Sequence, residues 1–389
     1  MVVVALIGTG WAGSMHARSY HKVCNIPFRL KTVCSLEPDL CEFAAAYHFE
    51  QYTACFEDVL QDEEVDVIDI VTPPALHYDM IEKALKAGKH IICEKPLIGY
   101  FGHGNLLPGN DPKQLMLDEV YENLKKIEIQ LQESRTILCY AENWIYSPPF
   151  MRMAELIKEK KTDLLAIYGH TGHKGSHASH AARWSSNGGG TLIRQGTHPI
   201  AAALYLKKQE MLRKCQTFGI KSVLCDCECL AGKKTAEEKK ALAVRSDDVE
   251  DWAQVIITFT DNTKASISSG DIFLSQIYNQ MEIYGNDAVY RVNMTPNNLL
   301  ETYWADDVNG EHVSIMEKND RNIGWQNALV IEDVIRGYVG QLQDFLECVA
   351  CGRKPQSDFN LAKETLIVVY AAYLSAEKRC AVNLEKYLV

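Results

Sequence analysis

The chain opens on Val2-Val3-Val4-Ala5-Leu6-Ile7-Gly8-Thr9-Gly10-Trp11-Ala12-Gly13, and this stretch decides the fold of its first half. The six apolar residues predict a buried strand, and the glycines after them have the spacing GxGxxG. In this setting Gly8 allows a tight turn, Gly10 lets the backbone approach a pyrophosphate, and Gly13 lets the next helix pack on the strand. The segment therefore predicts the start of a Rossmann domain that binds a dinucleotide, with Trp11 and Ala12 beside the phosphates.

Strands and helices alternate through the rest of the first half. Apolar runs predict strands at residues 30–34, 65–71, 90–93 and 136–140, and helical patterns fill residues 40–47 and 78–87. Such alternation predicts right-handed crossovers and a doubly wound parallel sheet with helices on both faces.

The pattern changes after Pro148-Pro149. Alternating apolar runs at residues 253–259, 264–268 and 280–284 predict antiparallel strands, with a hairpin turn at Asp261-Asn262. Because 389 residues fit two domains of ordinary size, we expect a first domain over residues 1–147 and a second α/β domain over residues 148–389.

The composition excludes several classes of protein. Forty basic against fifty-one acidic residues give a formal charge of −11, so the chain lacks the positive surface that nucleic acids and anionic membranes attract. No strictly apolar run approaches the length of a membrane span. Thirteen cysteines, an odd number spread along the chain, predict reduced thiols and a cytoplasmic protein. Cys225, Cys227 and Cys229 alternate without a second group of ligands, so no structural metal is expected.

The end of the second predicted strand bears on the choice between NAD and NADP. A carboxylate there binds the ribose 2′-hydroxyl of NAD, whereas an arginine accommodates the 2′-phosphate of NADP. Here the sequence is Cys34-Ser35-Leu36-Glu37, with Ser35 at the usual position of the acid and Glu37 two residues later. No arginine or lysine follows closely, and Glu37 would repel a phosphate. We therefore expect NAD as the cofactor.

Two motifs follow predicted parallel strands. Thr72-Pro73-Pro74 with His77 comes after the strand at residues 65–71, and Glu94-Lys95-Pro96 comes after the strand at residues 90–93. Ligands bind at this edge of open α/β sheets, so Thr72, Pro73, His77, Glu94 and Lys95 are candidates for cofactor contacts. A lysine at such a strand end faces either the ligand crevice or solvent.

Together with Gly188-Gly189-Gly190 and His198 farther on, these motifs resemble the glucose–fructose oxidoreductase/inositol dehydrogenase (Gfo/Idh/MocA) family. Glu250-Asp251-Trp252 and Gly352-Arg353-Lys354-Pro355 fit the same resemblance. It implies a Rossmann domain followed by an α/β domain with a large, mostly antiparallel open sheet. It also implies a homo-oligomer, dimer or tetramer, and hydride transfer between NAD(P) and a hydroxyl-bearing carbon of a sugar or cyclitol.

The resemblance places Lys95 beside the nicotinamide and the substrate. The family usually carries an aspartate four residues before the histidine, but this chain has Arg194 there. Lys95 and His198 therefore remain as the catalytic pair, and Arg194 becomes a candidate substrate contact. Without that aspartate, we expect His198 to lack an anionic partner at this position.

The stretch from Gly169 to His180 contains four histidines. The resemblance places it near the floor of the active site, where His170 and His173 can hydrogen-bond substrate hydroxyls. A metal site and a polar surface loop are the alternatives. Three aromatic residues are candidates for stacking on a sugar ring, with ordinary packing as the alternative: Trp144, Tyr146 and Trp184.

The loop at residues 98–114 is unusually long for a connection within a domain and contains four glycines. Because it begins three residues after Lys95, we expect it to border the active site or a subunit interface.

The sequence thus predicts an NAD-dependent enzyme that oxidises a secondary ring hydroxyl of a sugar, glycoside or cyclitol. The segments Arg194-Gln195-Gly196-Thr197-His198-Pro199 and Ala141-Glu142-Asn143-Trp144 resemble a subgroup that handles glycosides. This favours C3 as the reacting carbon and adds Asn143 to the candidate substrate contacts. An NAD-dependent glycosidase that oxidises C3 transiently and a non-catalytic NAD-binding sensor are the alternatives.

Overall fold

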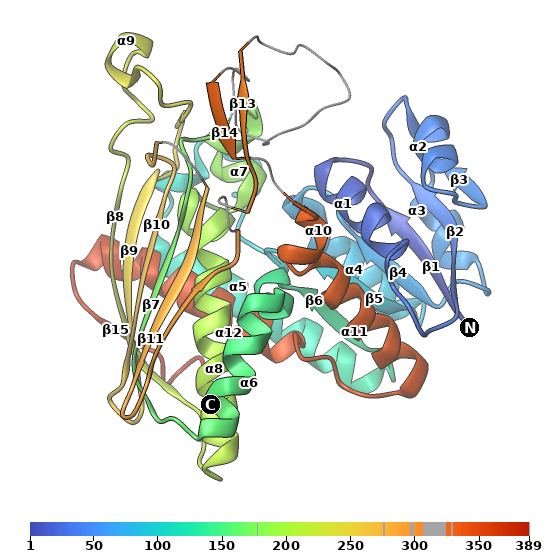
Figure 1. The fold of residues 1–389 in the computed structure, drawn as a ribbon. Helices are drawn as coiled ribbons and strands as arrows, with labels where there is room; N and C mark the ends of the chain where they lie inside the picture. The colour runs from blue at the N-terminus through green and yellow to red at the C-terminus, as the bar shows by residue number, and fades with distance from the viewer. Residues whose placement is uncertain (177, 275–276, 296–298, 306–323, 328–329, 389) are drawn as a thin grey trace.

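The computed structural model describes residues 1–176, 178–274, 277–295, 299–305, 324–327 and 330–388. Figure 1 shows two sheets on opposite sides of the molecule, with a layer of helices between them. The parallel sheet of the first half lies on one side, and a larger sheet built from the second half lies on the other. The candidate site lies where these two parts meet.

Six parallel strands form the first sheet, in the order β3-β2-β1-β4-β5-β6. The strand order reverses between β1 and β4, so the glycine turn after β1 lies at the topological switch point, where such sheets bind ligands. This order confirms the predicted doubly wound parallel sheet. The elements of this part are β1 (Val2–Ile7), α1 (Trp11–Tyr20), β2 (Phe28–Cys34), α2 (Leu40–Ala46), β3 (Gln51–Thr53), α3 (Phe56–Gln61), β4 (Val67–Ile70), α4 (His77–Lys86), β5 (His90–Glu94), α5 (Lys113–Glu133) and β6 (Leu138–Ala141).

Seven strands form the second sheet, in the order β12-β11-β7-β10-β9-β8-β15. All neighbouring pairs are antiparallel except β7 and β10, which confirms a mostly antiparallel sheet. Asp261 and Asn262 lie in the turn between β9 and β10, as predicted, whereas the strand predicted at residues 280–284 pairs with β7. The elements of this part are α6 (Pro148–Lys160), β7 (Leu164–Gly172), α7 (Trp184–Asn187), α8 (Thr197–Arg213), β8 (Ile220–Glu228), α9 (Ala236–Lys239), β9 (Trp252–Phe259), β10 (Lys264–Gly270), β11 (Tyr278–Gly285), β12 (Val289–Asn293) and β15 (Val382–Asn383).

The last helices of the chain connect the two parts. Helix α11 (Tyr338–Cys351) packs on α1 of the first part, and α12 (Phe359–Lys378) packs on α5, α8 and β8. Ahead of them come the short helix α10 (Glu332–Ile335) and the hairpin of β13 (Glu301–Trp304) and β14 (Gly324–Asn327). These helices therefore contact elements of both parts, which fixes the two sheets relative to each other.

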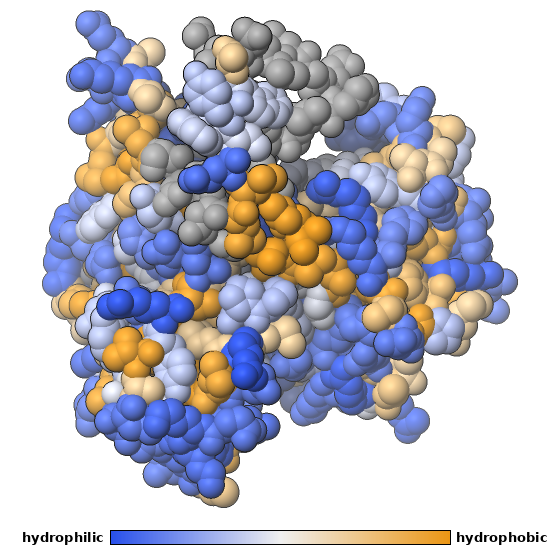
Figure 2. All heavy atoms as spheres, viewed as in Figure 1, coloured by the Kyte–Doolittle hydropathy of each residue, from blue (hydrophilic) through white to orange (hydrophobic). Residues whose placement is uncertain are grey.

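Polar and charged side chains cover most of the face seen in Figure 2. Apolar side chains gather beside α10 on this face. Val330 and Ile331, directly before α10, are among the exposed apolar residues of the molecule. Within the described ranges, every helix is too short or too polar to span a bilayer.

Candidate active site

Each glycine of the turn after β1 is needed for a different physical reason. Gly8 has a φ of +110°, which side chains rarely adopt, and a Cβ on Gly13 would overlap the main-chain oxygen of Gly8. A Cβ on Gly10 would instead meet no protein atom within 4 Å. The open space above Gly10, at the amino end of α1, fits the pyrophosphate of a dinucleotide.

The end of β2 presents a hydroxyl group where a carboxylate is usual. The Ser35 hydroxyl oxygen accepts a hydrogen bond from the Thr9 hydroxyl at 2.9 Å and from the Glu37 main-chain N–H at 3.2 Å. Leu36 and Glu37 are exposed beside it. Ser35 is therefore held against the glycine turn, with a negative charge two residues away.

His77 joins the two motifs at the ends of β4 and β5. Its ring nitrogens contact the main-chain oxygens of Thr72 and Pro96, both at 2.9 Å. Burial lowers the pKa of His77, although these contacts oppose the shift. The ring is completely enclosed, so His77 holds Thr72-Pro73 and the Lys95-Pro96 turn in place.

A buried chain of charged groups lies behind the lysine motif. His16 on α1 contacts Asp69 on β4 at 2.8 Å and Glu94 at the end of β5 at 3.3 Å, and Tyr20 donates to the same Asp69 oxygen. Burial lowers the pKa of His16, but the charges and hydrogen bonds of Asp69 and Glu94 outweigh it and raise the pKa to about 10. His16 is thus an imidazolium between two carboxylates. Sequence reasoning missed it, because a single histidine on a helix belongs to no motif.

Lys95 reaches from the first part of the molecule into the second. Its ammonium group donates a hydrogen bond of 2.8 Å to the main-chain oxygen of Arg194, and its main-chain N–H donates to Glu94 at 2.9 Å. Burial lowers the pKa of Lys95, and the charges of Arg194 and Arg336 act in the same direction, against those of Glu94 and Glu142. This balance makes Lys95 more easily deprotonated than an exposed lysine.

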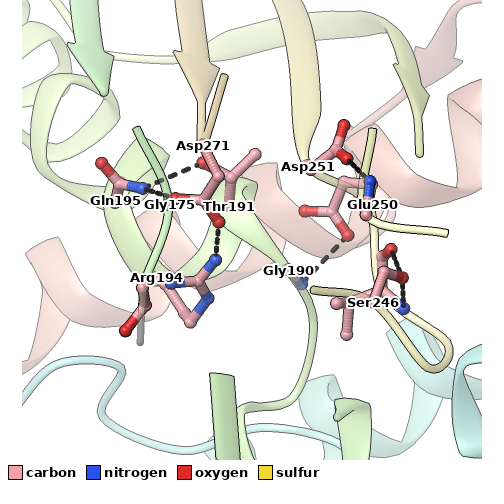
Figure 3. Close-up of polar contacts among 12 residues, drawn as sticks. Gly175, Gly190, Thr191, Arg194, Gln195, Ser246, Glu250, Asp251 and Asp271 are labelled. Atoms are coloured by element: carbon pink, nitrogen blue, oxygen red, sulfur yellow. Dashed lines mark hydrogen bonds and ion pairs between the residues drawn. The ribbon is translucent and has the colours of Figure 1, made fainter. Parts of the chain in front are cut away.

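The segment that carries Arg194 is a single π-helical turn, Leu192–Gly196, which runs directly into α8. Such turns are rare and concentrate at functional sites. Arg194 pairs with Asp271, which follows β10, and Gln195 donates to the other oxygen of that carboxylate at 2.6 Å (Figure 3). His173 also lies beside Asp271, with 3.4 Å between Nδ1 and the carboxylate oxygen. The structure therefore brings His173 and Arg194 together through Asp271, a residue that sequence reasoning did not select.

Glu250 holds the glycine segment that leads into this turn. It accepts a hydrogen bond from the N–H group of Gly190 at 3.0 Å (Figure 3). It also accepts from the N–H group of Leu192 at 2.8 Å and from the Tyr373 hydroxyl at 2.9 Å. Burial raises the pKa of Glu250 to about 7, although these hydrogen bonds oppose the shift. Glu250 of the motif Glu250-Asp251-Trp252 thus holds the backbone of residues 190–192, whereas Asp251 accepts hydrogen bonds from the N–H groups of residues 230–232.

His198 is the second residue of α8, and its imidazole contacts a carboxylate. Its Nδ1 lies 2.7 Å from Oε1 of Glu142, a completely buried residue after β6. The position four residues before His198 holds Arg194, as expected, and a carboxylate distant in the sequence supplies the negative charge instead. Trp144 stacks on the imidazole, with ring centroids 5.5 Å apart and planes inclined by 6°.

Four other candidate substrate contacts lie away from Lys95 and His198 or are enclosed. His170 shares the outer face of the second sheet with Tyr168, because strand residues alternate and the helices cover the opposite face. Tyr146 donates to Asp344 at 2.7 Å, and the Asn143 amide donates to the main-chain oxygen of Arg336 at 2.7 Å. Trp184 is 2% exposed and donates its indole N–H to the main-chain oxygen of Tyr100. These last three side chains use their polar groups in the interior, which gives them packing roles.

The loop at residues 98–114 packs on the glycine segment before the π-helical turn. The Tyr370 hydroxyl accepts a hydrogen bond from the Tyr100 N–H at 2.8 Å and donates one to the Gly188 oxygen at 2.9 Å. The Gly109 N–H donates to Asp248 at 2.9 Å, and Asp248 also accepts from the Trp184 N–H. The loop is thereby tied to the backbone that leads to Arg194 and His198.

The histidine-rich stretch was also a candidate metal site. Among the residues that the structure describes, no group of three or more histidine, cysteine, aspartate or glutamate side chains could hold a metal ion. His177 lies outside the described residues.

Two family descriptions match the chain. "Oxidoreductase family, NAD-binding Rossmann fold" matches residues 2–99, and "GFO/IDH/MocA C-terminal domain" matches residues 150–291. Together they cover more than half of the 389 residues. The first covers the glycine turn and Lys95, and the second covers the π-helical turn and His198.

Known relatives match over parts of their length. Levoglucosan dehydrogenase of Pseudarthrobacter phenanthrenivorans is 37% identical over 102 residues, which are 24% of this chain and 26% of that protein. Inositol 2-dehydrogenase/D-chiro-inositol 3-dehydrogenase of Lactiplantibacillus plantarum is 28% identical over 163 residues, which are 40% of this chain and 39% of that protein. The matches thus span about a quarter and two fifths of these relatives.

Solved structures share the fold over nearly the whole chain. GenD2 from gentamicin A biosynthesis, in complex with NAD, superposes with a TM-score of 0.79 at 20% identity, covering 98% of this chain and 96% of that one. Levoglucosan dehydrogenase in complex with NADH and levoglucosan gives a TM-score of 0.74 at 20% identity, with 99% of each chain covered. The two family matches and the strand order within each sheet lead to the same conclusion. The chain belongs to the Gfo/Idh/MocA family of oxidoreductases, and its first part is an NAD-binding Rossmann domain.

Proposed function

We propose that the protein is an NAD-dependent dehydrogenase that oxidises a secondary ring hydroxyl of a sugar, glycoside or cyclitol to a ketone. The observation that carries this proposal is the hydrogen bond from Lys95 to the backbone of Arg194, one turn before His198. Lys95, whose basicity is weakened by burial, follows β5 at the carboxyl edge of the Rossmann sheet, and its bond to Arg194 supports a place for His198 in the same site. The names of the matched relatives, levoglucosan and inositol dehydrogenases, support this class of substrate.

The residues that would hold the cofactor follow from the geometry of the first sheet. The turn Gly8, Gly10 and Gly13, with Trp11 and Ala12, would bind the pyrophosphate, and Ser35 with Glu37 would face the adenosine ribose. Thr72, Pro73, Glu94 and Lys95 would border the nicotinamide. Bound NAD supplies a hydride acceptor to the site. Ser35 and Glu37 favour NAD over NADP, since Glu37 would repel a 2′-phosphate.

Proton transfer is the task of this chain's own side chains. A ring hydroxyl is a very weak acid, so its oxidation near neutral pH needs a base poised near that pH. Lys95 hydrogen-bonds the reacting oxygen in this proposal, and His198 takes up the proton. His173 and Arg194 are the further contacts that we retain for the substrate, because Asp271 holds both beside the π-helical turn.

A panel of sugars, inositols and glycosides assayed with NAD tests the proposal. We expect NADH to form with at least one member and a ketone to appear in equal amount, at C3 if a glycoside reacts. His198→Ala should lower kcat and remove the acidic limb of the pH profile. Release of an aglycone without net NADH would instead indicate the glycosidase. Binding of NAD without turnover of any member would indicate the sensor.

Three expectations about the whole protein stay predictions. A homo-oligomer, dimer or tetramer, would use the outer face of the second sheet, where a hollow of about 480 Å³ is lined by Tyr168, His170, Gln254 and Tyr284 among others. Light scattering of the purified protein tests this, with a monomer as the contrary result. A cytoplasmic location and the division into domains at residues 147 and 148 stay predictions in the same sense.

A further inference from the structure

Glu142 lies directly after β6, and its side chain is completely buried. Its Oε1 accepts a hydrogen bond from the Trp144 main-chain N–H at 3.2 Å and lies 2.7 Å from Nδ1 of His198. An ionised carboxylate can only accept hydrogen bonds, so Nδ1 of His198 must carry a proton in this arrangement. In the neutral imidazole, Nε2 then keeps a free lone pair that can take up a proton.

The orientation of the imidazole is restrained from a second direction. The Trp144 ring, itself buried, stacks nearly parallel on the His198 ring, with planes inclined by 6°. A ring flip that moved Nε2 to the carboxylate would have to break the 2.7 Å contact and turn the imidazole plane out of its parallel stack with the indole. The carboxylate and the indole therefore select one tautomer and one orientation together.

The same carboxylate acts on Lys95. The negative charge of Glu142 raises the pKa of Lys95 and so opposes the effects of burial and of Arg194. Arg194 itself pairs its guanidinium with Asp271 (Figure 3). Among the described residues, Glu142 is the carboxylate that contacts His198, with 2.7 Å between Oε1 and Nδ1.

We propose that Glu142 is a positioning residue that fixes the tautomer and the orientation of His198 through the 2.7 Å contact with Nδ1. Glu142 holds His198 as the Nδ1–H tautomer, with Nε2 facing the reacting hydroxyl. During oxidation the hydroxyl proton moves to Nε2, the hydride on the same carbon leaves for NAD, and a C=O bond forms. Glu142 then stabilises the imidazolium that results. This inference rests on the proposed function for its catalytic part only.

Nitrogen NMR of ¹⁵N-histidine-labelled protein, without NAD or substrate, tests the structural part. The His198 signals are identified by their loss in His198→Gln. At a pH where His198 is neutral, we expect a protonated Nδ1 and an unprotonated Nε2. Glu142→Gln should give a mixture of tautomers, since an amide can donate as well as accept. Glu142→Asp should retain the Nδ1–H form, at least in part.

Asp271→Asn is the matched control, because it removes a buried carboxylate near Arg194 that does not touch His198. Its His198 signals should stay as in the wild type. A wild-type spectrum with the proton on Nε2 overturns the proposal, as does an unchanged tautomer in Glu142→Gln. If Glu142→Gln does not fold, the wild-type spectrum alone tests the proposal, because a proton on Nδ1 supports it and a proton on Nε2 overturns it.

Kinetics test the catalytic part and separate it from the proposed function. Glu142→Gln should lower kcat at least about tenfold, leave the dissociation constant of NAD within about threefold, and be partly rescued in Glu142→Asp. If the wild type oxidises a sugar and Glu142→Gln keeps its kcat, the inference fails while the function stands. If no sugar, inositol or glycoside reacts, the proposed dehydrogenase function is wrong, and the NMR spectra still test whether Glu142 fixes the tautomer of His198.

Discussion

The ammonium group of Lys95 donates a hydrogen bond of 2.8 Å to the main-chain oxygen of Arg194. Lys95 follows β5 of the parallel sheet, whereas Arg194 lies in the π-helical turn before α8, so this bond joins two distant segments at the candidate site. In a π-helix the oxygen of residue i accepts from the N–H of residue i+5. For Arg194 that residue is Pro199, which has no N–H. The oxygen is therefore without a π-type donor and can accept from Lys95.

Replacing Lys95 by alanine should lower kcat by at least about a hundredfold, because the substitution removes a group placed to assist proton transfer. NAD should bind nearly as well as before, since the glycine turn is untouched. Steady-state kinetics and NAD titration measure both quantities. Lys86→Ala, on the exposed surface of α4, is the control; retention of most activity in Lys95→Ala would rule out the assigned mechanism.

The fold was predictable where short-range patterns decide it. The apolar run of β1 and the three glycines after it are local features, and their positions match the structure. The spacing of His170 and His173 also indicates that the two side chains point to opposite faces of the sheet. Residues three apart in an extended chain point to opposite faces, so both could not reach one substrate from the same sheet.

The partners of the candidate site could not be predicted in this way. Glu142 and His198 are 56 residues apart, and Arg194 and Asp271 are 77 residues apart, with no motif to link them. Trp184 shows the converse problem. A large aromatic near a motif suits either a sugar ring or the core, and only the packed structure shows that its indole N–H is used by Tyr100.

Cofactor preference can be changed at the exposed end of β2. The wild type should prefer NAD, because Ser35 and Glu37 offer no cation to a 2′-phosphate. Leu36→Arg should lower the KM for NADP several-fold with little change for NAD, since Leu36 is 88% exposed and its replacement disturbs no packing. Leu36→Gln, of similar size but neutral, is the control. A wild type that prefers NADP would mean that Ser35 accepts the phosphate.

His16 should stabilise the protein most strongly below neutral pH. Its folded-state pKa of about 10 lies above the ordinary value of 6.5, so the stabilisation is complete below pH 6.5 and is lost as the pH rises towards 10. His16→Gln should cost about 3 kcal/mol at pH 6, because it leaves Asp69 and Glu94 buried without their cation. Urea unfolding at several pH values measures the difference. The exposed His21→Gln serves as control, and a cost for His16→Gln that does not shrink towards pH 10 would contradict the assignment.

The tie between the long loop and the glycine segment depends on one hydroxyl group. Tyr370→Phe removes the acceptor of the Tyr100 N–H and the donor to the Gly188 oxygen. Two buried polar groups are left without this partner, so we expect a loss of about 1–3 kcal/mol in the free energy of unfolding. We also expect a rise in the KM for the substrate, since Gly188 leads to the π-helical turn. Tyr121→Phe is a matched control, and an unchanged KM would make the loop a structural cover only.

Glu250 should make the stability of the protein fall as the pH rises through the weakly acidic range. Its folded-state pKa of about 7 is above the ordinary value of 4.5, so the protonated form is favoured by folding. The stabilisation is complete below pH 4.5 and is lost as the pH rises through 7, which amounts to roughly 3 kcal/mol. Glutamine cannot titrate, so Glu250→Gln should remove this slope, although the lost acceptor for the Gly190 N–H lowers stability at every pH.

The difference in unfolding free energy between wild type and Glu250→Gln therefore carries the test, because the other titrating groups cancel in it. It should fall by roughly 3 kcal/mol between pH 4.5 and pH 8. In this range Glu250 of the wild type must take up a proton when the chain folds, which becomes more costly as the pH rises, whereas the glutamine variant takes up none. Glu237→Gln, at an exposed position on α9, should show no such trend. A constant difference over this range would mean that Glu250 stays ionised in the folded protein. The N–H groups of Gly190 and Leu192 would then hold a full negative charge beneath the π-helical turn.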